Sequence, residues 1–182
     1  MASSVAVNPV EESAKTLSPE REKAVQQAIR TMNSSWKFQG YLISRLPIAW
    51  LAGMRLAKLD RQQCTATMPY RWLSQNPFQS IYFATQAMSA ELSTGALAIL
   101  AIAGCKPGVA MLIVHMEATY GKKADSKVYY TCAEGQKLFD AVDRAIRTGE
   151  GQRAVVETVG RLKDGTEVSR FKFTWSFKQR GA

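Results

Sequence analysis

The sequence has few of the residues from which metal, disulfide and nucleotide sites are built. Its 182 residues include one histidine and three cysteines, Cys64, Cys105 and Cys132. A single histidine excludes a multi-histidine metal site within one chain, and the cysteines stand far apart with no CxxC spacing. Their odd number argues against a disulfide framework, so we expect reduced thiols and no metal. Neither a GxGxxG nor a Walker pattern occurs, which disfavours nucleotide-dependent chemistry.

Acidic residues are in deficit, but the basic excess is nowhere dense. The chain has 24 Lys and Arg against 15 Asp and Glu, a formal net charge of +9. Such a balance suggests an anionic partner, namely nucleic acid, a membrane surface or a phosphate-rich cofactor such as coenzyme A, or else scattered surface charge. The only adjacent basic pair is Lys122-Lys123, so we expect no nucleic-acid partner; a nucleic-acid-binding module is the third functional alternative.

The first residues lack the marks of a signal peptide. Residues 1–18 are small and polar, with no basic start and only the short apolar run VAV, so we expect a flexible N-terminal segment. The length of the chain favours one domain, which we place at residues 19–182. These features predict a cytoplasmic protein.

The most apolar segment begins at Asn76 and ends at Gly104, and it holds one charged residue, Glu91. Asn76 is a preferred helix cap, Pro77 suits the position after it, and glycine commonly ends helices. We predict a helix over residues 77–103. Its length could span a membrane, but its Ser, Thr, Gln and Glu side chains favour a helix buried in protein, so we expect no membrane partner.

The remaining segments mix helical and strand patterns. Alternating residues predict strands, and the Asp-Gly of "KDGT" is a strong hairpin signal. Aromatic residues at every second position of the last strand predict core packing. The expected elements are an amphipathic helix from Ser18, a short helix or irregular cover over 36–50, a hairpin over 54–68, strands in 109–120 and 127–135, a helix in 136–151, and a hairpin over 152–178. One long helix wrapped by an antiparallel sheet is an α+β fold.

Two stretches carry a family resemblance. The helix segment "NPFQSIYFATQAMSAELSTG" and the hairpin "GRLKDGTEVSRFKFTWSFK" resemble the hotdog fold of the thioesterase superfamily, in its PaaI-like DUF4442 branch, over roughly residues 35–180. The resemblance implies one long buried helix wrapped by a curved sheet, and a homodimer with active sites between subunits; a tetramer stays open. It also implies acyl thioester substrates of coenzyme A or an acyl carrier, with coenzyme A as part of the substrate and no other cofactor.

The resemblance further implies a catalytic acid on the long helix, together with backbone N–H groups at the start of that helix. An unpaired buried carboxylate costs several kcal/mol or shifts its pKa, so Glu91 must be compensated or used. We predict that Glu91 is the general base or nucleophile. The alternative is a structural carboxylate that bridges two helices across the dimer, hydrogen-bonded to Thr94, Gln86 or an arginine.

Other candidate site residues lie near the predicted helix start and on the first long strand. Asn76, Gln79 and Ser80, with Phe78, could form an anion-stabilising pocket from free N–H groups, or Asn76 could simply cap the helix.

For substrate binding we name Phe78, Met88, Thr94 and His115. His115 could pair with Glu91 across a cavity, or it is a packed strand residue; no spacing supports a Cys-His dyad. Basic residues that could meet coenzyme A phosphates, or else are solvated, are Arg71, Lys106, Lys122 and Lys123.

The sequence therefore predicts an acyl thioester hydrolase, most simply an acyl-CoA hydrolase. The alternative is a non-catalytic hotdog protein that binds acyl-CoA or fatty acyl groups or regulates another protein. The two share a pocket and differ at Glu91.

Overall fold

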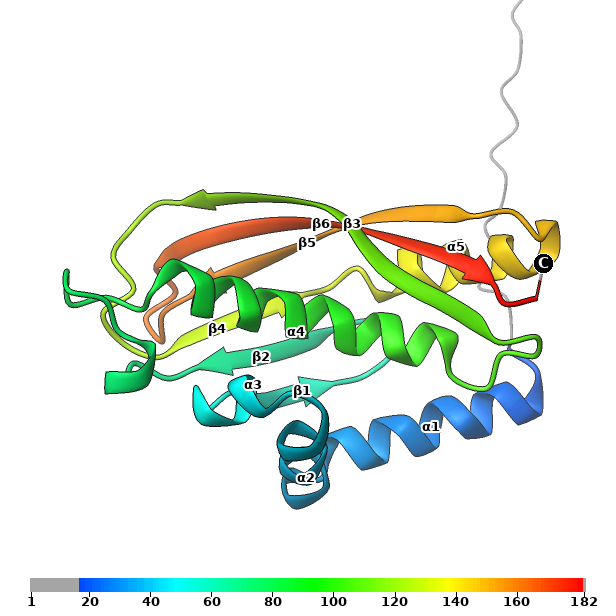
Figure 1. Cartoon of the computed structure of the whole chain (residues 1–182), viewed down its shortest axis with the longest axis horizontal. Helices are drawn as coiled ribbons and strands as arrows, with labels where there is room; N and C mark the ends of the chain where they lie inside the picture. Colours follow the sequence, from blue (N-terminus) through cyan, green and yellow to red (C-terminus); the bar gives the residue numbers. More distant parts are fainter. Residues whose placement is uncertain (1–16, 182) are drawn as a thin grey trace, which may run out of the picture.

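The computed structural model describes residues 17–181, so the predicted flexible segment lies outside it up to residue 16. Within the described range the chain forms five α-helices, one 3-10 helix and six strands (Figure 1). In chain order they are α1 (Pro19–Asn33), α2 (Ser35–Arg45), α3 (Pro47–Leu51), β1 (Arg55–Leu59), β2 (Cys64–Met68), η1 (Trp72–Ser74), α4 (Phe83–Ile102), β3 (Val109–Tyr120), β4 (Val128–Cys132), α5 (Gly135–Thr148), β5 (Gln152–Arg161) and β6 (Glu167–Gln179).

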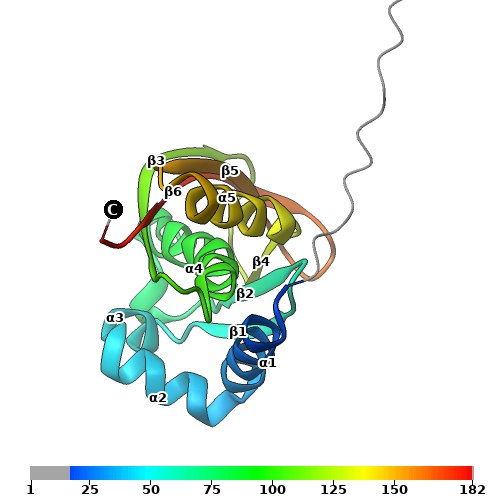
Figure 2. The ribbon, with the colours of Figure 1, turned by 90° about the vertical axis from the view of Figure 1, so that its right-hand side faces the viewer.

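The six strands form one antiparallel sheet in the order β1-β2-β4-β5-β6-β3. The sheet curves around α4, and α5 packs between α4 and strands β5 and β6 (Figures 1 and 2). In Figure 2 the wrap stays open on one side, between β3 and α3. The α+β layout expected from the sequence is confirmed, with one long helix inside a curved sheet.

Helix α4 is buried along most of its length. Twelve of its twenty residues are buried, which is why its sequence is apolar on nearly all sides. Within the part of the chain that the structure describes, no helix is both long and apolar enough to cross a membrane.

The predicted start of this helix at residue 77 is wrong, because α4 begins at Phe83. Asn76 instead closes a tight turn, in which its side-chain Oδ1 accepts from the backbone N–H groups of Phe78 (3.0 Å) and Ser80 (3.2 Å). Gln79 in this turn has a φ of 57°, a left-handed conformation that a helix cannot contain. Asn76 therefore caps a turn and stands seven residues before the first residue of α4.

The N-terminal helices cover one edge of the sheet. The predicted amphipathic helix is confirmed as α1, with Ser18 as its cap. Arg21 fixes α1 to the core, since it forms an ion pair with Asp143 of α5 at 2.5 Å and donates to the carbonyl oxygen of Ala101 in α4 at 2.8 Å. The segment predicted as a short helix or irregular cover forms two helices, α2 and α3, which are separated before Pro47.

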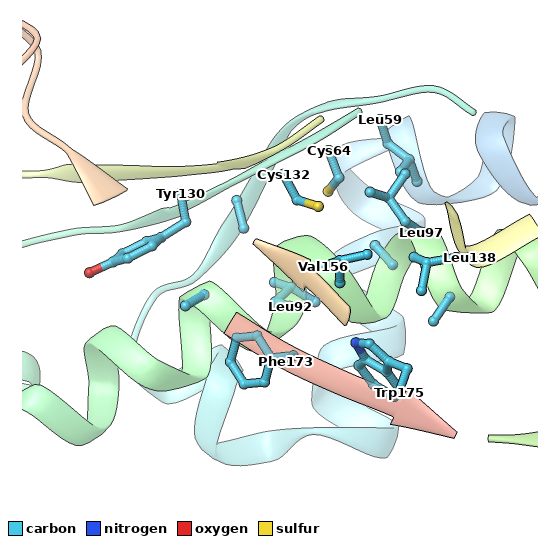
Figure 3. Close-up of a cluster of buried hydrophobic side chains, with 14 of the residues drawn as sticks. Leu59, Cys64, Leu92, Leu97, Tyr130, Cys132, Leu138, Val156, Phe173 and Trp175 are labelled. Carbon is cyan, nitrogen blue, oxygen red and sulfur yellow. The ribbon is translucent and has the colours of Figure 1, made fainter. Parts of the chain in front are cut away.

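Buried side chains from the strands fill the space around α4. The four aromatic residues at alternate positions of β6 are buried, as predicted: Phe171, Phe173, Trp175 and Phe177. Figure 3 shows Phe173 and Trp175 beside α4, and the thiols of Cys64 and Cys132 in the same core. Cys64 and Cys132 face each other across β2 and β4 as free thiols, and burial raises the pKa of Cys132 to about 11.

A buried polar network joins α4 to the sheet. The Tyr130 hydroxyl and the Ser169 hydroxyl both donate to Oε1 of Gln86 at 2.9 Å, and the Gln86 amide donates to the Ile81 carbonyl at 3.0 Å. Gly160 lies against the Tyr130 ring, where an added Cβ would stand 2.4 Å from ring atom Cε1. The lack of a side chain at Gly160 therefore allows Tyr130 to reach Gln86.

We expect Gly160→Ala to lower the free energy of unfolding by about 1–3 kcal/mol, because the added methyl group displaces a buried ring. The control is Gly40→Ala in α2, where nothing lies within 4 Å of the added Cβ. Alanine there should raise the free energy of unfolding by about 0.5–1 kcal/mol, as in other helices. Urea denaturation measures both, and equal effects at the two sites would contradict the role given to Gly160.

Candidate active site

A cavity of about 650 Å³ lies on the open side of α4. Its walls come from α3 with the residues just before it, from the first half of α4, and from β3 and β6. Met54, Met88, Leu92, Met116 and Phe173 are typical of the lining, which is apolar apart from two charged residues, Arg45 and Glu91. Volume and composition are those of small-molecule sites, which place a few polar groups on apolar walls.

Glu91 brings a carboxylate to this apolar wall. It is partly buried, and its carboxylate has no hydrogen bond or ion pair among residues 17–181. Burial in these surroundings raises the pKa of Glu91 to about 6. The carboxylate is therefore a poised acid–base group at neutral pH, in contact with a space that a ligand can occupy.

Gly95, one turn further along α4, makes room for this carboxylate. An added Cβ at Gly95 would lie 2.7 Å from Oε1 of Glu91, and 3.5 Å from the Trp175 ring. No real Cβ is found so close to an oxygen, so a larger residue would push the carboxylate elsewhere. The glycine therefore sets the position of the Glu91 side chain.

The expected structural partners of Glu91 are engaged with other groups. The Thr94 hydroxyl donates to the backbone carbonyl of Glu91 at 3.0 Å and accepts from Trp175 Nε1 at 3.2 Å. Gln86 belongs to the network with Tyr130 and lies on the sheet side of α4. Within one chain, neither Thr94 nor Gln86 holds the Glu91 carboxylate, and Thr94 does not line the cavity. The alternative of a carboxylate that bridges two helices across a dimer stays a prediction.

The predicted anion pocket at Asn76, Gln79 and Ser80 is not formed as expected. The N–H groups of Phe78 and Ser80 donate to Asn76 Oδ1, and that of Gln79 donates to the Asn76 carbonyl at 3.0 Å. The first helical bond of α4 runs from Gln86 N to the Tyr82 carbonyl. The amides that point out of the helix start are thus those of residues 83–85. No sequence pattern indicated that the backbone amides of residues 83–85 would be the free ones.

His115 does not face Glu91, and it is not a packed residue either. It lies on β3 with 62% of its side chain exposed, 3.4 Å from the Glu117 carboxylate, and it does not line the cavity. A bulge between Ile113 and His115 shifts the strand register. Alternation from Ile113 would turn His115 inward, but after the bulge Met116 faces the cavity instead.

The other predicted binding residues fall on different sides of the molecule. Met88 lines the cavity, as predicted, whereas Phe78 is 78% exposed and lies outside it. Lys122 and Lys123 border a second hollow of about 480 Å³ beside the start of α4, together with Phe78. Lys106 pairs with Glu20 on the surface. Sequence analysis missed Arg45 and Met116, whose place in the cavity depends on how α3 and β3 pack.

One protein-family model matches most of the chain. Residues 34–177 match the family described as "Domain of unknown function (DUF4442)". No curated protein matches the chain.

Solved structures show the fold. A Pseudomonas aeruginosa protein of unknown function, described as a probable thioesterase, has a TM-score of 0.69 at 15% identity and covers 80% of this chain and 96% of its own. A thioesterase from Haemophilus influenzae has a TM-score of 0.60 at 14% identity, and the match covers 82% of this chain and 93% of the thioesterase chain. The PaaI protein of the E. coli phenylacetic acid degradation operon has a TM-score of 0.55 at 11% identity, and the match covers 84% of this chain and 97% of the PaaI chain. At these identities the likeness shows the fold alone, which is the hotdog fold.

We expect Glu91→Gln to make the protein more stable at high pH and to leave it unchanged at low pH. The pKa of Glu91 lies near 6 in the folded chain and at an ordinary 4.5 when unfolded, so the folded state binds the proton more tightly. The contribution of Glu91 to the stability of the wild type is then highest below pH 4.5 and is lost as the pH rises through 6. The neutral amide avoids this loss, a gain of up to about 2 kcal/mol at pH 8.

Urea denaturation at pH 4 and pH 8 measures this difference. The control is Glu150→Gln, an exposed carboxylate after α5, which should keep the wild-type pH dependence. A Glu91→Gln variant that is no more stable than the wild type at pH 8 would show that the folded site solvates the charge of Glu91 as well as water does.

Proposed function

The chain belongs to the DUF4442 family, and from that premise we propose that it hydrolyses acyl thioesters, with Glu91 as the general base. The observation that carries the proposal is an unpaired, partly buried carboxylate on the wall of an otherwise apolar cavity. Two proteins with this fold, a probable thioesterase from Pseudomonas aeruginosa and a thioesterase from Haemophilus influenzae, support the same reaction class.

The chemistry follows from the state of Glu91. With a pKa near 6 the carboxylate is largely ionised at pH 7 and is a stronger base than an ordinary carboxylate. It removes a proton from a water molecule, whose oxygen forms a bond to the thioester carbonyl carbon. The tetrahedral intermediate then collapses with loss of the C–S bond, and the proton passes to the leaving thiolate. The products are a carboxylic acid and a free thiol.

The first amides of α4, at residues 83–85, are the proposed donors to the carbonyl oxygen. Ala84 stands seven residues before Glu91, so about 10 Å separates them along the helix. The two groups of one chain are therefore not adjacent. A second copy with its α4 antiparallel would bring its helix start next to Glu91, and we therefore propose a homodimer.

The open edge of the sheet suits such a dimer. Strand β3 is an edge strand of twelve residues, and its exposed side chains include Leu112, Val114 and Met116. Exposed edges of this length are normally covered, most simply by the same strand of a second copy. Such pairing would place the second copy along the β3 border of the open side, opposite the border formed by α3 (Figure 2).

The cavity and its surroundings suggest the parts of the substrate. Apolar walls such as Met88, Leu92 and Phe173 favour a hydrocarbon acyl group without polar substituents. Lys122 and Lys123 flank the start of α4, where they could meet the phosphates of coenzyme A. We propose acyl-CoA as the substrate, with coenzyme A released as the thiol.

We expect hydrolysis of at least one substrate in a panel of short, medium, long and aromatic acyl-CoAs. Glu91→Gln should lower kcat by about 10²–10⁴-fold, the usual contribution of a general base, and should leave acyl-CoA binding largely intact. Glu150→Gln is the matched control and should keep full activity. Binding without turnover on any substrate would favour the non-catalytic acyl-binding alternative, and full activity of Glu91→Gln would exclude Glu91 as the base.

We expect Gly95→Ala to lower kcat strongly with a small effect on KM, because the added methyl group displaces the Glu91 carboxylate and leaves the apolar walls unchanged. Steady-state kinetics on the best acyl-CoA measures the split. Gly40→Ala, which meets no neighbour, is the control. Unchanged kcat in Gly95→Ala would mean that the position of the carboxylate does not matter for the reaction.

A further inference from the structure

Helix α2 is apolar on two opposite sides. Phe38 and Leu42, one turn apart, are buried against the protein. Trp36 and Ile43, two turns apart and thus on one side, are 75% and 53% exposed. The helix repeat places these two pairs on roughly opposite faces. One apolar side of α2 is therefore packed and the other is left in water.

The short helix α3 continues the exposed apolar surface. Leu46, Ile48 and Leu51 are all exposed, and Ile48 reaches 66%. In Figures 1 and 2 α2 and α3 lie at the lower outside of the molecule, on the same side as β1. We define the α2–α3 surface by its exposed residues: Trp36, Lys37, Ile43, Arg45, Leu46, Ile48 and Leu51. Exposed apolar patches of this kind mark binding to a protein or a membrane.

The charge of this surface distinguishes between those two partners. The sequence from Lys23 to Leu59 contains six Lys and Arg and no Asp or Glu. Lys37 and Arg45 are exposed among the apolar side chains. Trp beside Leu, Ile and basic residues is typical of helices that lie in the interface of an anionic bilayer. A second copy using the same surface would bring like charges together with no acid to pair them.

We propose that the α2–α3 surface docks on anionic phospholipid membranes, with α2 lying in the plane of the interface. The apolar side chains enter the boundary between headgroups and acyl chains, and Lys37 and Arg45 meet lipid phosphates. The proposal goes beyond the proposed function and takes the place of our expectation, from sequence, of a protein without a membrane partner.

The same segment also forms a wall of the cavity. Residues 45–49 line it, so docking would set this wall of the cavity against the bilayer. Long acyl chains partition into bilayers, and a chain could then reach the cavity along an apolar path. Membrane binding itself does not require hydrolysis, so its test is independent of the reaction at Glu91.

Sedimentation with vesicles tests the proposal. Wild-type protein should bind vesicles of phosphatidylcholine mixed with phosphatidylglycerol, bind phosphatidylcholine alone at least tenfold more weakly, and lose affinity as salt is added. The double variant Trp36→Ser/Ile43→Ser should bind the mixed vesicles at least tenfold more weakly. Val155→Ser, an exposed apolar residue on β5, is the matched control and should bind as wild type.

A charge pair of variants completes the experiment. Lys37→Glu should weaken binding to the mixed vesicles, whereas Lys163→Glu, exposed in the β5–β6 turn, should not. Thermal unfolding checks that the variants are folded. Absence of binding to mixed vesicles at low salt, or equal losses for Lys37→Glu and Lys163→Glu, overturns the proposal. A change of oligomeric state in Trp36→Ser/Ile43→Ser by size-exclusion chromatography also overturns it, since a second copy would then cover this surface.

Discussion

Everything in this fold depends on the enclosure of α4. The sheet, α5 and α1 surround the helix on all sides but one, so its enclosed faces accept only small, apolar or hydrogen-bonded residues. A charged side chain can stand only on the open side. Glu91 is the one charged residue of α4 and it stands there, at the wall of the cavity. Fold and candidate chemistry therefore meet at a single helical position.

The rotation of α4 about its axis decides where Glu91 points, and buried polar pairs fix that rotation. The Ser93 hydroxyl bonds to Thr158 Oγ1 at 2.7 Å, and the Trp175 indole donates to Thr94. Gln86 makes the same kind of link with strand residues nearer the helix start. Apolar packing alone would allow α4 to rotate somewhat about its axis, whereas hydrogen bonds at defined positions allow little rotation.

Sequence patterns predicted the elements and their order well, because those depend on local periodicity and caps. They failed where tertiary packing overrides local preference. Asn76 and Pro77 carry the signals of a helix start, yet the chain uses them for a turn and begins α4 at Phe83. A bulge that no local pattern reveals turns His115 outward. Of the predicted site residues, Glu91 and Met88 line the cavity. They stand three residues apart on one face of α4, so the helical pattern alone brings them together. Arg45 and Met116 needed the packing of distant segments.

The order of the elements along the chain sets a problem for biosynthesis. Helix α4 precedes β3, β4, β5 and β6, so it leaves the ribosome before four of the six strands that enclose it. Until β6 with its buried Phe177 has been synthesised, this apolar helix is not fully buried. Folding requires contacts between distant parts of the chain, which makes it slow and leaves aggregation-prone intermediates exposed. Nascent chains of this topology should accordingly be substrates for chaperones that hold apolar helices until translation ends.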